Sequence, residues 1–282
     1  MLRFREDLRS LTFMAISTAL LYEGLVTPVG WWSLALIPAS CLFFYICFTI
    51  NHNQLHLGMF RATPLNIAAN ILLSLCTGVP VTMIYLPHVQ NHHPNPCNGK
   101  DWAGAHLVDG HQGLWRALIY IAKAQIAPMK MRPRSLFAGL NTYRKSSLCL
   151  EALALGIYIA YALYAHPVSF LLHNLLPWFL SMNALILMNF ALHDGCDYDS
   201  KLDHSLTFTT KIGNYFLLNN GYHLAHHEQP KMHWSKLPHY HNETVKPRAR
   251  TEFEKVSILK HLRLMYFFIP KVAKNEVVAK KT

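Results

Sequence analysis

Long stretches without charge constrain this chain more than any other feature of its sequence. Residues 31–50, WWSLALIPASCLFFYICFTI, and residues 167–192, PVSFLLHNLLPWFLSMNALILMNFAL, contain no Asp, Glu, Lys or Arg. Residues 10–27 contain only one acid, and so do residues 146–165. Roughly 20 helical residues cross the hydrocarbon core of a bilayer. The four stretches therefore predict four transmembrane helices, arranged as two hairpins because the turns between them are short.

The positions of Lys and Arg predict how these helices are oriented. The chain has 282 residues and a formal net charge of +11. Its basic residues precede the first and third predicted helices and are frequent after residue 200, whereas the turns at 27–31 and 165–168 contain none. By the positive-inside rule, both termini and the central loop are expected on the cytoplasmic side. This distribution favours an anionic membrane surface, and not nucleic acid, as the partner of the basic residues.

Residues 65–86 form a fifth apolar stretch with two interpretations. Gly78 and Pro80 interrupt it, and if it crossed the membrane, His52 and His88 would lie on opposite sides. We therefore expect a re-entrant or interfacial helical segment here, with a full crossing as the alternative.

The remaining segments complete the expected architecture. Residues 114–127 are expected to form an interfacial helix, and residues 271–282 a mobile basic tail. The sequence thus predicts an all-α, multi-pass integral membrane protein in which residues 1–282 form a single domain. Two helical hairpins would carry a cytoplasmic helical cap.

Histidine is unusually frequent, with 18 residues, and nine of them follow a pattern. Three clusters, HNQLH, HVQNHH and HLAHH, have helical or nearly helical spacing, and a further histidine ends NFALH, one turn after an asparagine. Residues three and four apart share one face of a helix, so each cluster can direct several imidazoles toward one centre. The nine histidines are His52, His56, His88, His92, His93, His193, His223, His226 and His227, and the asparagine is Asn189.

The number and placement of these imidazoles point to two metals. With four transmembrane helices, every cluster reaches the cytoplasmic membrane surface. A metal such as zinc takes three or four protein ligands, so nine imidazoles fit two metals with four or five each. Imidazole suits Zn, Cu and Fe. A metal transporter would require ionisable residues inside the helices, and purely structural histidines would not converge on one face. A histidine-rich di-metal site in the cap is therefore the favoured interpretation.

The succession HxxxH, HxxxHH and HxxHH, with apolar stretches between, resembles the membrane fatty acid desaturase family from about residue 40 to 245. The tract NNGYHLAHHEQPKMHWSKLP is similar to that family's third histidine box, and NFALH to its additional Asn–His element. The resemblance implies a non-haem centre of two Fe ions that uses O₂. The nine histidines would be iron ligands, and Asn189 a ligand through water. The second box departs from the HxxHH of many members, and on a regular helix His88 and His93 would lie about 140° apart.

The resemblance also implies an activity and partners. The expected reaction is O₂-dependent introduction of a double bond into a fatty acyl chain at the cytoplasmic membrane face. Membrane di-iron hydroxylases and alkene-forming decarboxylases, acting on acyl or other lipid chains, share the motif and remain alternatives. No haem-binding HPGG and no G-x-G-x-x-G after a strand occurs. Electrons are therefore expected from a separate donor of the ferredoxin, rubredoxin or cytochrome b5 type.

Two features around the expected centre are also predicted. An apolar tunnel between the helices and the cap would set the position of reaction along the acyl chain. Asp194, Asp197 and Glu228 are expected to accept hydrogen bonds from ligand N–H groups, with ordinary solvated loop acids as the alternative.

Overall fold

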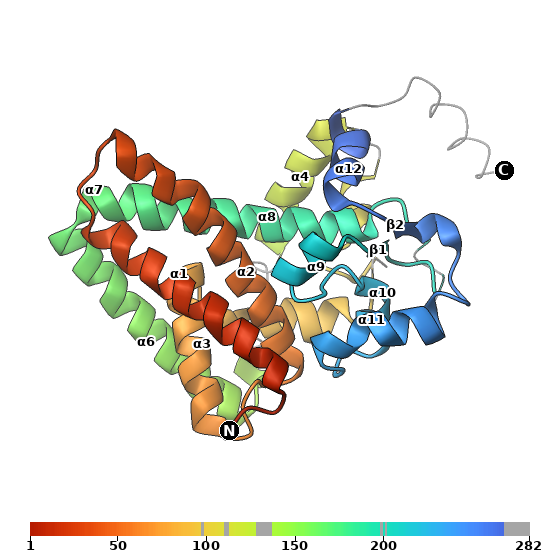
Figure 1. The fold of residues 1–282 in the computed structure, drawn as a ribbon, viewed down its shortest axis with the longest axis horizontal. Coiled ribbons are helices and arrows are strands. Elements are labelled where there is room, and N and C mark those ends of the chain that lie inside the picture. The colour runs from red at the N-terminus through yellow and green to blue at the C-terminus, as the bar shows by residue number, and fades with distance from the viewer. Residues whose placement is uncertain (97–98, 110–112, 128–136, 198–199, 201, 268–282) are drawn as a thin grey trace.

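Helices dominate the part of the chain that the structure, a computed structural model, describes (Figure 1). The described residues are 1–96, 99–109, 113–127, 137–197, 200 and 202–267. The predicted tail at 271–282 lies outside them. Within the described residues, six helices have 14 or more residues: α1 (Leu8–Val26), α2 (Leu36–His56), α3 (Thr63–Thr77), α4 (Gly113–Ile126), α6 (Thr142–Ala165) and α8 (Leu176–His193).

Shorter elements connect and extend these helices. The short α-helices are α7 (Pro167–Ser169), α9 (Lys211–Phe216), α10 (His223–Glu228), α11 (Leu237–Tyr240) and α12 (Ile258–Leu262). Turns of 3₁₀ helix cover Arg5–Asp7, Trp31–Ala35, Val81–Ile84, Ala105–Val108, Trp234–Lys236 and Thr251–Phe253. Wider π-helical turns cover Leu86–His92, Phe170–Leu175, His241–Val245 and Arg263–Phe267. The strands β1 (Thr207–Phe208) and β2 (Glu254–Lys255) pair in parallel, a small departure from the expected all-α fold.

Three helices of the described chain are long and apolar enough to cross a membrane: Trp31–His56, Thr142–Ala165 and Pro167–His193. Their bounds agree closely with three of the four predicted spans. The remaining predicted span, residues 10–27, is the first in chain order. It is helical as α1 but is not among these three helices. Its crossing of the membrane, and the two-hairpin arrangement that depends on it, therefore stay predictions.

The fifth apolar stretch breaks where the sequence indicated. Helix α3 and the segment Val81–His92 are bent by 91°, and together they are apolar enough for one broken span or a re-entrant loop. Gly78 ends α3 with φ 73°, a left-handed conformation that favours glycine. A Cβ at this position would lie 2.4 Å from the Trp178 ring of α8. The close approach of α8 thus adds a packing reason for glycine at the break.

The long helices pack on one another and carry the C-terminal elements at one end. Helix α2 contacts α1, α3 and α8, and α3 also contacts α6. The elements from β1 to α11 lie near the end of α8 that bears His193 (Figure 1). Trp234 donates from Nε1 to Asp7 Oδ1 at 3.0 Å, which joins this C-terminal region to the start of the chain.

Helix α4 covers the stretch for which the sequence predicts an interfacial helix. It forms at the predicted position and packs against α8. Trp115, Leu118 and Ile126 are exposed on it, whereas Tyr120 is buried against the rest of the protein. The position of α4 at the membrane–water boundary stays a prediction.

Candidate metal centre

All nine predicted histidines gather in one place and divide into two groups. In each group, one potential ligand atom per histidine lies within 4.8 Å of all the others. The first group contains His52, His56, His88, His93 and His226, and the second contains His92, His193, His223 and His227. Four segments far apart in the chain supply them: the end of α2, the turn Leu86–His92 with the residue after it, the end of α8, and α10. We refer to these sets as the five-histidine group and the four-histidine group.

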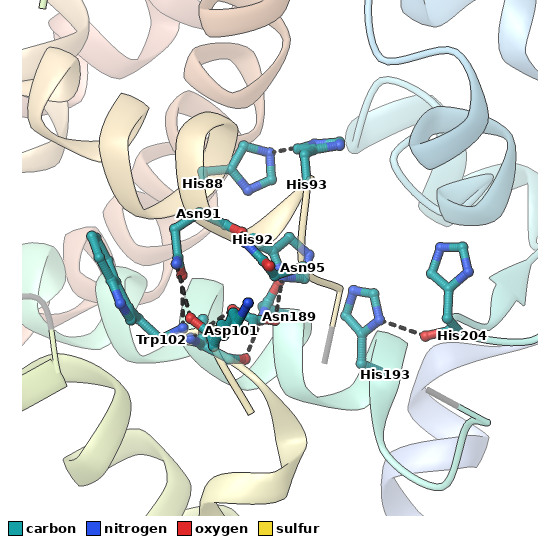
Figure 2. Close-up of polar contacts among 12 residues, drawn as sticks. His88, Asn91, His92, His93, Asn95, Asp101, Trp102, Asn189, His193 and His204 are labelled. Carbon is teal, nitrogen blue, oxygen red and sulfur yellow. Dashed lines mark hydrogen bonds and ion pairs between the residues drawn. The ribbon is translucent and has the colours of Figure 1, made fainter. Parts of the chain in front are cut away.

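A π-helical turn explains how the second cluster serves both groups. His93 donates its backbone N–H to the carbonyl of His88 at 3.1 Å, a bond five residues back along the chain. This wide turn brings residues five apart onto one side, whereas a regular α-helix would separate them. The Nε2 atoms of His88 and His93 consequently lie 3.2 Å apart (Figure 2), and His92 turns toward the four-histidine group.

The spacing of the ring nitrogens fits ligands around a metal. In the five-histidine group, Nε2 of His88 lies 3.1 Å from that of His56, and Nε2 of His226 lies 3.1 Å from that of His93. Nitrogens bound to one metal at about 2.1 Å lie roughly 3.0–3.4 Å apart.

The four-histidine group has the same spacing. Nε2 of His223 lies 3.0 Å from that of His193 and 3.1 Å from that of His227.

Buried ring nitrogens without partners lead to the same conclusion. Both ring nitrogens of His52 are buried with no hydrogen-bond partner, and so is Nε2 of His92. An orphaned buried polar atom costs free energy unless a ligand or an ion satisfies it. Burial lowers the pKa of His223, His226 and His227 well below the ordinary value, which keeps these side chains in the neutral form that binds metals. The donor set therefore fits metal ions at both groups.

Hydrogen bonds on the far side of two rings fix the tautomer needed for ligation. His193 donates from Nδ1 to the backbone carbonyl of His204 at 2.7 Å (Figure 2). His92 donates from Nδ1 to Asp101 Oδ2 at 2.8 Å, and both side chains are buried. With the proton on Nδ1, each ring presents the lone pair of Nε2 to the four-histidine group.

Asp101 was not among the acids that the sequence indicated. The structure pairs Asp194 with Arg116 and Tyr266, and Glu228 with Arg248 and Tyr240. Asp197 lies 3.6 Å from Arg250. Asp194 and Glu228 directly follow His193 and His227 in the chain, and Asp197 follows His193 by four residues. Asp101 instead lies in a loop nine residues after His92, and its place after the second box was the one available signal.

The loop that contains Asp101 also reaches Asn189. Trp102 donates its N–H to Asn91 Oδ1 at 2.7 Å, and Ala103 donates its N–H to Asp101 Oδ1 at 2.9 Å. The Ala103 carbonyl accepts from Asn189 Nδ2 at 3.2 Å and from the hydroxyl of Tyr120 at 2.5 Å. Asn189 is thus held beside the histidines, while its role as a ligand through water stays a prediction.

A cavity of about 480 Å³ adjoins both histidine groups. His52 and His88 of one group and His92 and His223 of the other reach its wall. Most of the remaining wall is apolar and comes from α2, the segment 79–87, α4 and α8; among these residues are Phe48, Ile84, Leu185, Ile186, Met188 and Leu192. Such a volume and lining are typical of a binding site for an apolar small molecule.

Several helices long and apolar enough to cross a membrane, together with paired histidine groups beside an apolar cavity, define a class of integral membrane proteins with a histidine-rich site. Within that class, the chain belongs to the fatty acid desaturase family, whose model matches residues 29–255. The match includes all nine histidines and Asn189. Membership implies an oxidoreductase that acts on fatty acyl chains. None of the curated proteins compared with the chain matches it significantly.

Proposed function

We propose that this protein is an O₂-dependent oxidoreductase that introduces a double bond into a fatty acyl chain. The observation that carries the proposal is the apolar cavity whose wall contains histidines of both groups. An acyl chain in this cavity would pass directly beside two sites able to hold metal ions. The cavity is also the feature that the sequence could not locate.

The two histidine groups would hold two Fe ions. His52, His56, His88, His93 and His226 would bind one, and His92, His193, His223 and His227 would bind the other. Asn189 lines the same cavity, and its Nδ2 already donates to Ala103 and Tyr120. Its carbonyl oxygen is therefore the atom suited to hold a water molecule beside the second iron.

The reaction fixes what the protein must provide. Bound iron would supply the activation of O₂ that removal of hydrogen from an unactivated methylene requires. Each double bond consumes one O₂, two electrons and two protons and releases two waters, so an electron donor is needed. A separate carrier protein of the ferredoxin, rubredoxin or cytochrome b5 type would deliver these electrons. The distribution of Lys and Arg supports delivery at the cytoplasmic face.

The side chains around the cavity have two tasks in this scheme. Apolar residues such as Phe48, Leu185 and Ile186 exclude water and hold the acyl chain extended along the wall. The hydrogen bonds of Asp101 and of the His204 carbonyl hold His92 and His193 in the ligating tautomer. The protein thus positions substrate and ligands, which is the part of catalysis that a fold contributes to cofactor chemistry.

Lipid and fatty-acid mass spectrometry on cells that express the wild type or His226→Ala tests this function. We expect the wild type to form a product lighter than its precursor by two hydrogens, and the variant to form none. His239→Ala is the matched control, because His239 is exposed and pairs with Glu243. It should behave like the wild type. A product with an added oxygen would indicate a hydroxylase, and a product that has lost a carbon would indicate a decarboxylase.

A further inference from the structure

Glu151 is a fully buried carboxyl group in α6, a helix apolar enough to cross a membrane. Ionisable residues inside such helices are rare and costly, and they usually have a role. The histidine groups do not include Glu151.

The two carboxyl oxygens of Glu151 bind a short segment on the far side of the break after α3. Oε2 accepts the backbone N–H of Thr82 at 2.9 Å, and Oε1 accepts the Thr82 hydroxyl at 2.5 Å. Ser147, one turn earlier on α6, donates its hydroxyl to Oε1 at 2.6 Å. Ser74 of α3 lies 3.3 Å from Oε2 and accepts the N–H of Val81 at 3.0 Å. Glu151 therefore joins α6, α3 and the turn Val81–Ile84.

That turn forms part of the wall of the cavity. Val79, Pro80, Met83 and Ile84 line the cavity, whereas Thr82 between them is buried against Glu151. The chain then runs directly into the turn that carries His88, which also lines the cavity. The carboxyl group of Glu151 thus fixes the segment 79–84 from the side opposite to the cavity.

We propose that Glu151 is a positioning residue that sets where along the acyl chain the reaction occurs. The proposal rests on the proposed function. A methylene chain has no polar group that could anchor it. Which methylene lies beside the histidines therefore depends on the shape of the cavity wall. If the segment 79–84 loses its bonds to α6, several registers become accessible and the product becomes a mixture of positional isomers.

Thr82→Val and Ser147→Ala form a matched pair for testing this role. Each removes one hydroxyl that donates to Glu151 Oε1, but only Thr82 lies in the segment 79–84, whose residues Val79, Pro80, Met83 and Ile84 line the cavity. Thr82→Ser retains the hydroxyl and should restore wild-type behaviour. Glu151→Leu removes all the bonds together and provides the strongest perturbation.

The first readout is the position of the new functional group, whether a double bond or a hydroxyl, determined by mass spectrometry of derivatised fatty acids. In Thr82→Val, the ratio of the main isomer to its neighbours should fall by about tenfold, equivalent to ~1.4 kcal/mol. Ser147→Ala and Thr82→Ser should keep the wild-type ratio. Equal shifts in Thr82→Val and Ser147→Ala, or no shift in Thr82→Val, would overturn the proposal.

The second readout does not require activity. Amide hydrogen exchange in detergent should be about tenfold faster across residues 79–86 in Glu151→Leu, because the N–H of Thr82 loses its acceptor. Unchanged exchange would overturn the positioning role even if the wild type formed no product. A wild type that is inactive while this exchange responds would refute only the proposed function.

Discussion

Replacement of Asp101 by Asn tests whether the four-histidine group holds its own metal. Asp101 accepts hydrogen bonds from His92 Nδ1 at 2.8 Å and from the N–H of Ala103 at 2.9 Å. An asparagine has one carbonyl oxygen and can keep only one of them. If the carbonyl oxygen keeps the hydrogen bond from the N–H of Ala103, the NH₂ group of the asparagine faces His92. It then favours the His92 tautomer that is protonated on Nε2. That tautomer has no lone pair to offer the four-histidine group.

The expected effect can be estimated from such contacts in other metal sites. Loss of a residue that orients a ligating histidine lowers metal affinity about 10–100-fold. This corresponds to about 1.4–2.7 kcal/mol. Because Asp101 orients His92, a member of the four-histidine group, the five-histidine group should keep its metal.

Metal content per chain, measured by mass spectrometry after dialysis against increasing chelator, gives the result directly. We expect Asp101→Asn to lose one of two irons at a chelator concentration about 10–100-fold lower than the wild type. Asp203→Asn is a suitable control, because Asp203 Oδ2 accepts a hydrogen bond from Arg250 Nε at 3.0 Å and Asp203 belongs to neither histidine group. Simultaneous loss of both metals, or retention of both at wild-type affinity, would refute the reasoning.

Two further substitutions test the break after α3 and the cavity. Gly78→Ala should destabilise the protein by more than about 1–2 kcal/mol, the cost of a left-handed conformation with a side chain, because its Cβ also meets Trp178. The unfolding temperature in detergent should fall, whereas Gly156→Ala, with open space around its Cβ, should leave it unchanged or higher. Ile186→Trp should shorten the acyl chains that are converted, by filling the cavity, without altering metal content. Leu180 is exposed on the same helix, so Leu180→Trp should change neither the length of the converted acyl chains nor the metal content. An equal effect of both substitutions would contradict the proposal that the acyl chain binds in the cavity.

Charge-free stretches predicted the long helices well, because crossing a bilayer imposes length and composition together. The two longest uncharged stretches became parts of Trp31–His56 and Pro167–His193. Helix α1 differs because it contains Arg9 near its start and Glu23 near its end. The length of this helix and its apolar composition alone did not decide whether it crosses the membrane.

The histidines were predictable as a set but not as two groups. Spacing along the chain identified all nine, since each cluster stands out locally. Their division depends on the π-helical turn at Leu86–His92, which hydropathy and spacing do not reveal. Asp101 and the cavity depend on contacts between distant segments. A pattern in one segment carries no information about such contacts.

The wide turn at Leu86–His92 also determines how this region can tolerate changes in length. In HxxxHH on a π-helical turn, the first and last histidines are five apart and joined by one turn of backbone, as the bond from His93 to His88 shows. In HxxHH on an α-helix, the first and last histidines are four apart and again joined by one turn. Removing a single residue between His88 and His92 would therefore convert one turn into the other. His88 and His93 would still face the five-histidine group, and His92 would still face the four-histidine group. We therefore expect that the second histidine cluster can gain or lose one residue without moving a histidine from one group to the other.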